Sequence, residues 1–182
     1  MGNMFRDLTA DEIECRVSQA SQYGVNLLLY KDARCDQNIL DETVGAMNWM
    51  RSHTRENANC IVSIWDDKKQ QWISKEDTGT ESNTEKEKGL ASDSFKRACF
   101  NWGIGRELYT APFIKIAPEA CKSLKEINGK WKCYDTFEVQ KIIIESKRIV
   151  ALAIRNAATK KTCFVWQDEK WEAERKKVSG NV

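Results

Sequence analysis

The sequence predicts an α+β fold, in which a three-stranded antiparallel sheet carries a long packed helix and a β-rich extension follows. Three observations support this prediction. Apolar residues make up 41% of the 182 residues, which is enough for a hydrophobic core. Strand patterns occur at residues 49–54, 60–65 and 71–77, and a polar turn lies between the last two. The strongest helical pattern of the chain follows directly, at residues 85–102.

The elements before this sheet are predicted to be a helix, a strand and a second helix. Thr9 and Glu12 have the spacing of a capping box, so the first helix begins near them. The apolar run at residues 25–30 is typical of a short buried strand. Residues 35–44 have a helical pattern that Gly45 ends.

The helix at residues 85–102 has one apolar face, which predicts that it packs on the sheet. The residues of this face are Ala91, Phe95, Ala98, Cys99 and Trp102. Three further strands are expected at residues 137–145, 149–155 and 162–166, before a charged tail. The predicted domains are therefore a core at 1–116, a linker at 117–132 and a β-hairpin-rich extension at 133–182.

Charge is distributed unevenly along the chain. Residues 1–95 hold 11 Lys and Arg against 17 Asp and Glu, whereas residues 96–182 hold 18 against 10. A basic half suits a polyanionic partner, although a charge run is more often a solvated face. No apolar run of transmembrane length and no signal peptide are present, so a cytoplasmic protein is expected.

Catalytic and metal signatures are weak. The chain has no phosphate-binding loop for ATP, and its single histidine, His53, leaves little room for a histidine-based triad. The seven cysteines contain no C-x-x-C pair, so we expect reduced thiols that fill the core, with no metal and no cofactor. A metal-dependent nuclease that uses Asp77, Glu81 and Glu85 is one alternative.

The segment at residues 93–103 carries the clearest functional signal. On a helical wheel Lys96 and Arg97 point away from the apolar face, and Phe100 lies between them. Cations bind phosphates and an aromatic ring can stack on a base, so this exposed group suits nucleic acid. A contact of Phe100 with a neighbouring subunit explains the pattern equally well.

This region resembles the Rad-fifty-two and Rad-twenty-two single-strand annealing proteins and their phage relatives of the Sak type. The resemblance covers about residues 30–110. An E-D-x-G strand end, a K-x-A-x-x-D-x-x-K-R-A helix and an aromatic residue before glycine match at Glu76, Asp77, Gly79, Lys88, Ala91, Asp93, Lys96, Arg97, Ala98, Trp102 and Gly103. Residues 45–49 are similar to the family's F-G-x-x-x-W turn, with Val44 in place of Phe.

The resemblance implies a β-β-β-α core, an oligomeric ring and a groove that holds single-stranded DNA with its bases outward. It makes Lys96, Arg97 and Lys88 candidate DNA-binding residues, together with Arg34, which lies within one residue of a family arginine. Phe100 stands where the family has a third cation, so stacking is expected to replace a phosphate contact there.

The expected function is therefore ATP-independent annealing of complementary DNA strands in phage recombination or repair, without enzymatic activity. A plain single-strand-binding accessory protein is the other alternative. Expected partners are single-stranded DNA and further copies of the chain, with a phage exonuclease or a host single-strand-binding protein as candidates. The bacterial cytoplasm is the expected location, and no membrane contact is expected.

Overall fold

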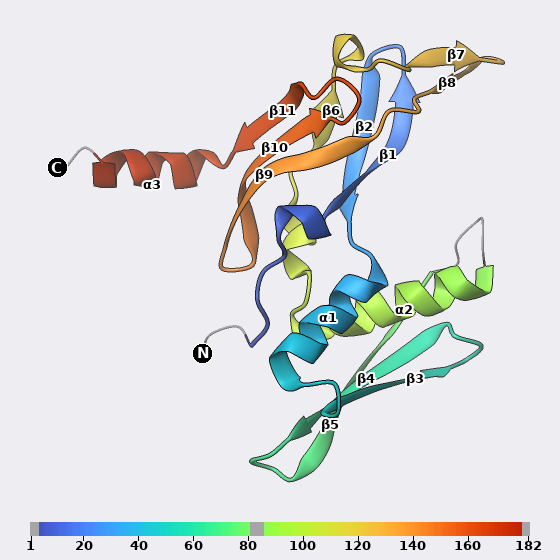
Figure 1. Cartoon of the computed structure of the whole chain (residues 1–182), viewed down its shortest axis with the longest axis vertical. Coiled ribbons are helices and arrows are strands. Elements are labelled where there is room, and N and C mark those ends of the chain that lie inside the picture. The colour runs from blue at the N-terminus through green and yellow to red at the C-terminus, as the bar shows by residue number, and fades with distance from the viewer. Residues whose placement is uncertain (1–3, 81–85, 180–182) are drawn as a thin grey trace. The chain divides into compact units, whose positions relative to one another are not determined.

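The computed structural model describes residues 4–80 and 86–179, without side chains for residues 86–88 and 177–179. Within these residues the chain is α+β, with three α-helices and three sheets built from antiparallel strand pairs, which confirms the predicted class (Figure 1). Contacts divide the chain into two units. Unit 1 comprises residues 1–7 and 32–106, and unit 2 comprises residues 8–31 and 107–182.

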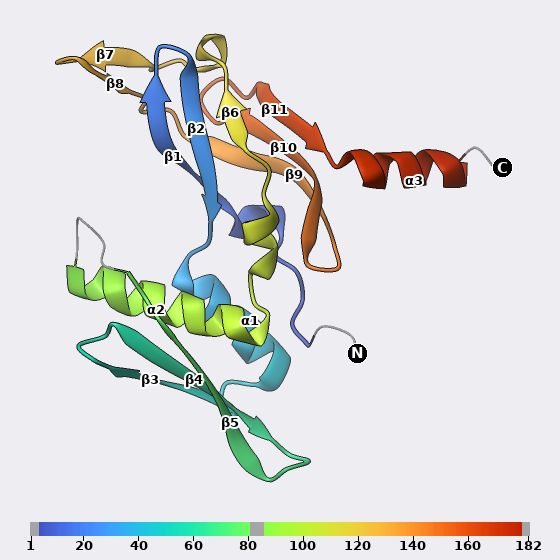
Figure 2. The ribbon, with the colours of Figure 1, turned by 180° about the vertical axis from the view of Figure 1, so that it is seen from behind.

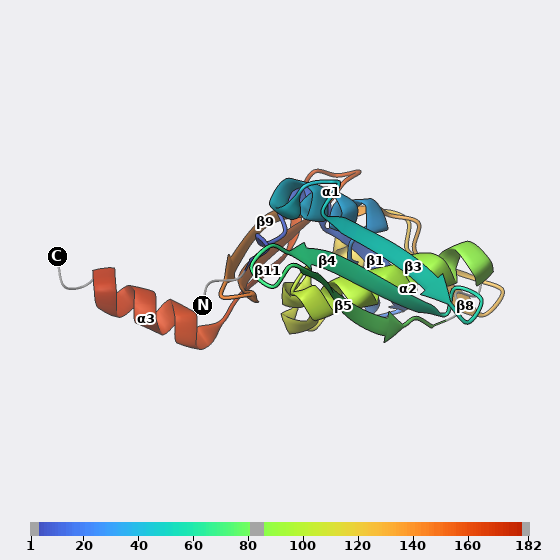
Figure 3. The same ribbon diagram turned by 90° about the horizontal axis from the view of Figure 1, so that it is seen from below.

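Unit 1 contains a three-stranded sheet with two helices on one of its faces (Figure 3). Its strands are β3 (Trp49–Thr54), β4 (Asn59–Asp66) and β5 (Gln71–Thr78), and its helices are α1 (Ala33–Val44) and α2 (Lys86–Trp102). Helix α1 ends at Gly45, whose φ of 86° lies in the left-handed region that favours glycine. The five elements confirm the predictions for this part of the chain to within about two residues.

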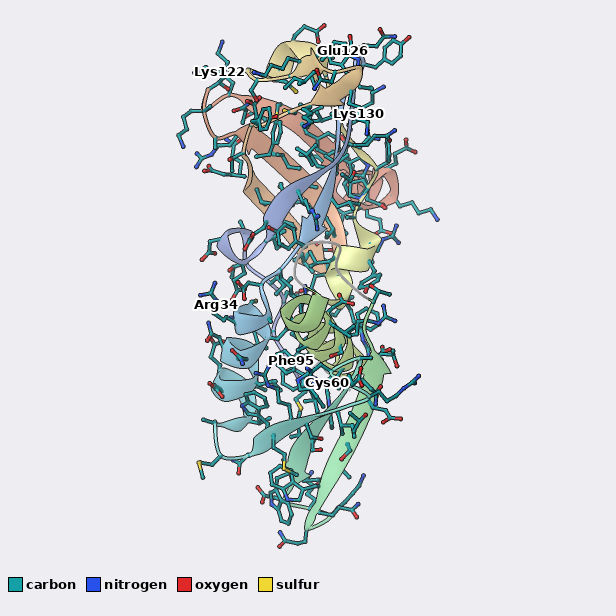
Figure 4. All side chains as sticks on the ribbon, turned by 90° about the vertical axis from the view of Figure 1, so that its right-hand side faces the viewer. Arg34, Cys60, Phe95, Lys122, Glu126 and Lys130 are labelled. Atoms are coloured by element: carbon teal, nitrogen blue, oxygen red, sulfur yellow. The ribbon has the colours of Figure 1, made fainter. Side chains whose placement is uncertain are left out.

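Unit 1 has its apolar core between these helices and the sheet. Phe95 of α2 and Cys60 of β4, both labelled in Figure 4, are completely buried. The strands alternate as expected for a half-buried sheet, with Cys60, Val62 and Ile64 turned inward along β4.

Unit 2 is a six-stranded antiparallel sheet with the order β11-β10-β9-β1-β2-β6. Its members are β1 (Glu14–Ser21), β2 (Gly24–Tyr30), β6 (Ile114–Ile116), β9 (Phe137–Glu145), β10 (Arg148–Asn156) and β11 (Thr162–Gln167). Figure 2 shows β1, β2 and β6 side by side. The chain also forms the short 3-10 helices η1 (Ala10–Glu12), η2 (Arg106–Thr110) and η3 (Pro118–Ala120), a hairpin of β7 (Lys125–Ile127) and β8 (Lys130–Lys132), and helix α3 (Glu169–Ser179).

The first predicted helix is wrong. The capping box exists, because the Thr9 amide donates to the Glu12 carboxylate at 2.9 Å, but it closes only the single turn of η1. The chain then forms β1, which pairs with β2 on one side and β9 on the other. Pairing with a strand more than 100 residues away in sequence therefore outweighs the local signal for a helix.

The structure also places the domain boundaries differently from the sequence. Strands β1 and β2 lie within the predicted core at 1–116, but they share a sheet with the C-terminal strands of the predicted extension. The predicted linker at 117–132 contains η3, β7 and β8, all within unit 2. The three C-terminal strands themselves confirm the prediction.

No helix in the described ranges combines the length and the apolar character needed to cross a bilayer.

Candidate nucleic-acid interface

Helix α2 is fixed to the sheet by its apolar face, as predicted. The Phe95 ring stacks on Trp49 of β3 with 6.1 Å between ring centroids, and the guanidinium of Arg51 lies 4.7 Å from the Phe95 centroid. At the end of the helix the Trp102 indole donates to the Val62 carbonyl at 3.0 Å. Ala98 is completely buried between these two contacts. The residues on the other flanks of α2 are thereby held in a fixed orientation.

Gly79 of the E-D-x-G strand end and Asp93 of the helix motif connect the end of β5 to α2. A Cβ atom on Gly79 would lie 2.6 Å from the Ser94 amide nitrogen, so only glycine allows this approach. The Asp93 carboxylate accepts from the Thr80 amide at 2.8 Å. The spacing of these motif residues therefore has a structural cause that is independent of any ligand.

Arg97 points toward the end of β5 and forms an ion pair there. Its Nε atom lies 3.4 Å from Oδ1 of Asp77, and the Arg97 side chain is 42% exposed. Asp77 also accepts from the Asn101 amide at 3.4 Å and from the Thr78 amide nitrogen at 2.7 Å. Arg97 can still reach solvent, but its charge is partly neutralised by Asp77.

The charge of Lys96 acts on Asp32, the residue that caps the start of α1. Asp32 caps α1 by accepting from the Arg34 amide at 2.8 Å, and it pairs with the Arg34 guanidinium, also at 2.8 Å. The Arg34 hydrogen bonds and, to a smaller degree, the charge of Lys96 lower the pKa of Asp32 to about 2. Asp32 thus pairs directly with Arg34 and is also within the electrostatic influence of Lys96, so both predicted cations act on the same carboxylate.

Phe100 follows Lys96 by one helical turn and contacts Arg106. The Arg106 guanidinium lies 5.5 Å from the Phe100 ring centroid. It also donates to the carbonyls of Phe100 and Asn101, at 2.8 and 3.0 Å, and so caps the end of α2. Phe100 is half-buried, which corrects the prediction of an exposed ring between Lys96 and Arg97.

Arg106 is exposed, and it was not predicted as a site residue. Its position after two glycines at the helix end was the available signal, because cations are favoured near helix C-termini. We refer to Arg34, Lys96, Phe100 and Arg106 as the cation–aromatic row.

The remaining candidates are less well defined. Lys88 lies in α2, but its side chain is outside the described residues. Of the three carboxylates in the nuclease alternative, Glu81 and Glu85 also lie outside the described residues, and Asp77 is occupied by Arg97 and its neighbours.

Unit 2 carries a second basic surface that the sequence analysis missed. Lys122, Lys125, Lys130 and Lys132 are all exposed on or near the β7–β8 hairpin, and Figure 4 labels Lys122, Glu126 and Lys130 at this end of unit 2. The Lys125 ammonium lies 5.8 Å from the centroid of Tyr134, which is 62% exposed. Over the whole chain, unit 2 has 17 Lys and Arg against 13 Asp and Glu, and unit 1 has 12 against 14.

The hairpin was overlooked because residues 119–132 lack the apolar alternation of a half-buried strand. Its lysines in alternate positions around Trp131 were the available signal. Comparisons with known proteins add no further assignment, because no protein-family model, no curated protein and no solved structure matches the chain.

Proposed function

We propose that this chain binds single-stranded DNA and anneals complementary strands without ATP, as a recombination protein of phage type related to the Rad-fifty-two proteins, with unit 1 as its β-β-β-α annealing core. The observation that carries the proposal is the cation–aromatic row. It comprises three cations and one ring from separate segments of unit 1: Arg34 and Lys96 both act on Asp32, Arg106 lies against Phe100, and α2 carries two of the four.

The chemistry of annealing requires little more than such a surface. Cations neutralise the phosphates of one strand so that a second strand can approach, and the bases stay free to pair. Base-pair stacking then supplies about 1.4 kcal/mol per step, so no nucleotide hydrolysis is needed. A half-buried ring such as Phe100 can support a base or a sugar without reading its sequence.

Self-assembly is the second part of the proposal. In the order β3-β4-β5 both outer strands are edges, and within the described residues neither β3 nor β5 pairs with another strand on its outer side. Exposed edges are usually covered or paired, and pairing between copies would align the cation–aromatic rows of neighbouring subunits. Light scattering of the full chain tests this. Multimers of the 21.0 kDa chain are expected. A chain that stays monomeric with and without DNA would refute the proposed oligomeric ring.

The central experiment measures binding and annealing of labelled oligonucleotides by the full chain. Binding should favour single strands over blunt duplex at matched salt, and pairing should proceed without ATP and in the presence of a chelator. Lys96→Ala should weaken both. Lys68→Ala is the matched control, because Lys68 is an exposed lysine of the same unit in the β4–β5 turn. Equal effects of the two substitutions would argue against the cation–aromatic row.

Two other functions remain as outcomes of the same experiment. A plain single-strand-binding protein is favoured by the basic β7–β8 hairpin, and it would bind DNA without accelerating annealing. In that case Lys125→Ala together with Lys130→Ala should weaken binding more than Lys96→Ala does. Magnesium-dependent cleavage of the labelled strand would instead support the nuclease alternative. The proposal places the protein in the bacterial cytoplasm, where an exonuclease could supply the single strands.

A further inference from the structure

Four of the seven cysteines gather in unit 2. Cys15, Cys121, Cys133 and Cys163 are half-buried and pack against the apolar core of that unit. Cys35, Cys60 and Cys99, by contrast, are buried in unit 1 and fit the predicted role of apolar fillers. All seven lie within the described residues, and none of them forms a disulfide.

Two of these thiols and one carboxylate converge at the base of the β7–β8 hairpin. The sulfur atoms of Cys121 and Cys133 and a carboxylate oxygen of Asp135 all lie within 4.8 Å of one another. Cys121 follows η3 directly and Cys133 follows β8 directly, so the hairpin itself brings the two sulfurs together. Among the described residues, no other group of three histidine, cysteine or acidic side chains comes this close.

Asp135 is held in place by groups that do not depend on a ligand. Its Oδ2 accepts from the Lys122 amide at 2.5 Å and from the Asn156 side chain at 3.0 Å. Asn156 is completely buried, and it also donates to the Ala120 carbonyl at 3.0 Å. Burial opposes ionisation of Asp135, but hydrogen bonds from Ser123, Lys122 and Asn156 outweigh it and lower the pKa of the carboxyl. A carboxylate is therefore present beside the two thiols.

The thiol of Cys121 is in the opposite situation. Burial, followed by the neighbouring Cys133, raises the pKa of Cys121 to about 12, so this thiol stays protonated without a counter-charge. A thiophilic divalent cation reverses this, because metal coordination deprotonates a thiol outright. A surface cavity of about 430 Å³, lined by Cys121, Lys122 and Cys163 among others, gives solvent access to this region.

We propose that Cys121, Cys133 and Asp135 bind one thiophilic divalent cation, of which Zn²⁺ is the biological example, and that the cation fastens the base of the β7–β8 hairpin. Two sulfurs and one carboxylate oxygen supply three ligands of a tetrahedral site, and water from the adjoining cavity supplies the fourth. Binding releases the two thiol protons to solvent and leaves the oxidation state of every atom unchanged. The proposal is independent of the proposed function in unit 1.

The test is a titration of the full chain, first reduced and freed of metal by a chelator, with Cd²⁺ as the spectroscopic probe. Cadmium–thiolate charge transfer should saturate at one ion per chain. Cys121→Ser and Cys133→Ser should each remove most of this absorption. Asp135→Asn should weaken binding by at least the roughly 10-fold to 100-fold typical of residues that only support metal ligands.

The matched control is Cys15→Ser, which removes a thiol of the same unit and similar exposure. The pKa of Cys15 is also raised to about 12, by burial and then by Cys163 and Glu138, but Cys15 does not belong to the group of three. This variant should bind Cd²⁺ like the wild type. Zn²⁺ should raise the melting temperature of the wild type and of Cys15→Ser, and it should slow amide exchange in the hairpin.

Several results would overturn the proposal. They are a wild-type chain that folds but binds no Cd²⁺, an equal loss in Cys15→Ser, or a chain purified without reductant in which Cys121 and Cys133 are joined as a disulfide. If a serine variant fails to fold, Asp135→Asn still decides the question, because it keeps every thiol and should lower only the affinity.

Discussion

If the cation–aromatic row binds DNA as proposed, Asp32 should limit that binding, and Asp32→Asn should therefore tighten it. Asp32 pairs with Arg34 and also lies in the field of Lys96, so it neutralises part of the cation–aromatic row. Asparagine caps a helix about as well as aspartate, so α1 should still begin at Ala33. The loss of a charge at the helix N-terminus should cost about 0.3–1 kcal/mol of stability, which a folded unit tolerates.

The size of the effect follows from the exposure of the pair. The side chains of Arg34 and Asp32 are 82% and 42% exposed, and such surface pairs contribute about 0–1 kcal/mol. Arg34 must give up this interaction to bind a phosphate, and a phosphate near Asp32 would also be repelled. Asp32→Asn removes both the competing ion pair and the repulsion of the phosphate, and it should therefore tighten binding by about two-fold to ten-fold. One additional phosphate contact should steepen the dependence of log K on log salt by about 0.7.

The assay is fluorescence anisotropy of a labelled single strand at several salt concentrations. Glu42→Gln is the matched control, because Glu42 lies near the other end of α1 and pairs with Arg6 at 2.8 Å. It removes the same charge and breaks a similar pair, but at a distance from the cation–aromatic row along the helix. Unchanged binding in Asp32→Asn, or an equal gain in Glu42→Gln, would refute the reasoning.

The remaining predictions concern α2 and the strand beneath it. Lys96→Ala should lower the slope of log K against log salt concentration by about 0.7. Arg97→Ala should lower it less, because Asp77 already neutralises part of the Arg97 charge. A larger change in Arg97→Ala than in Lys96→Ala, measured by anisotropy, would contradict this. Phe100→Ala should cost about 1–3 kcal/mol of binding with little change in salt slope if the ring stacks on a base, and it should shift the oligomer distribution first if the ring packs on a neighbouring subunit. Unchanged affinity and unchanged assembly would exclude both roles. Burial, followed by a neighbouring arginine, lowers the pKa of His53 below its ordinary value of 6.5. The folded state thus favours the neutral imidazole of His53. Protonation of His53 is less favourable in the folded than in the unfolded chain, so the free energy of unfolding is unaffected above pH 6.5 and decreases as the pH falls below that value. Melting temperatures measured between pH 7 and pH 5 should fall in the wild type and fall less in His53→Gln, and parallel curves would disprove the role of His53.

The sequence predicted unit 1 well because its signals are local. A polar turn separates β4 from β5, Gly45 ends α1, and the apolar face of α2 identifies the side that meets the sheet. Lys96 and Arg97 could be assigned to the polar flanks of α2 on this basis alone. Their carboxylate neighbours could not be predicted, because Asp77, which pairs with Arg97, and Asp32, on which the charge of Lys96 acts, come from other elements and approach α2 only in the folded unit.

Unit 2 was harder to predict because its pairings are long-range. Strand β1 is polar along much of its length and contributes mainly Cys15 and Val17 to the core, so its alternation is weak in the sequence. The cysteine cluster was hidden for a related reason. Cys121 and Cys133 are separated by a whole hairpin, and a search for closely spaced pairs cannot find ligands that a hairpin brings together.

The interleaving of the two units determines how the proposed functions can be separated. A chain cut after Arg106 would keep all of unit 1, but it would also keep β1 and β2 without their neighbours β9 and β6. Val25 and Leu27 of β2, which are 1% and 3% exposed, would then lose the strand that pairs with them at Ile116 and Ile114. A two-stranded hairpin is at best marginally stable alone, so such a fragment would expose apolar surface and aggregate for reasons unrelated to DNA. Point substitutions in the full chain, rather than truncation, are therefore the sound way to separate the cation–aromatic row from the basic hairpin.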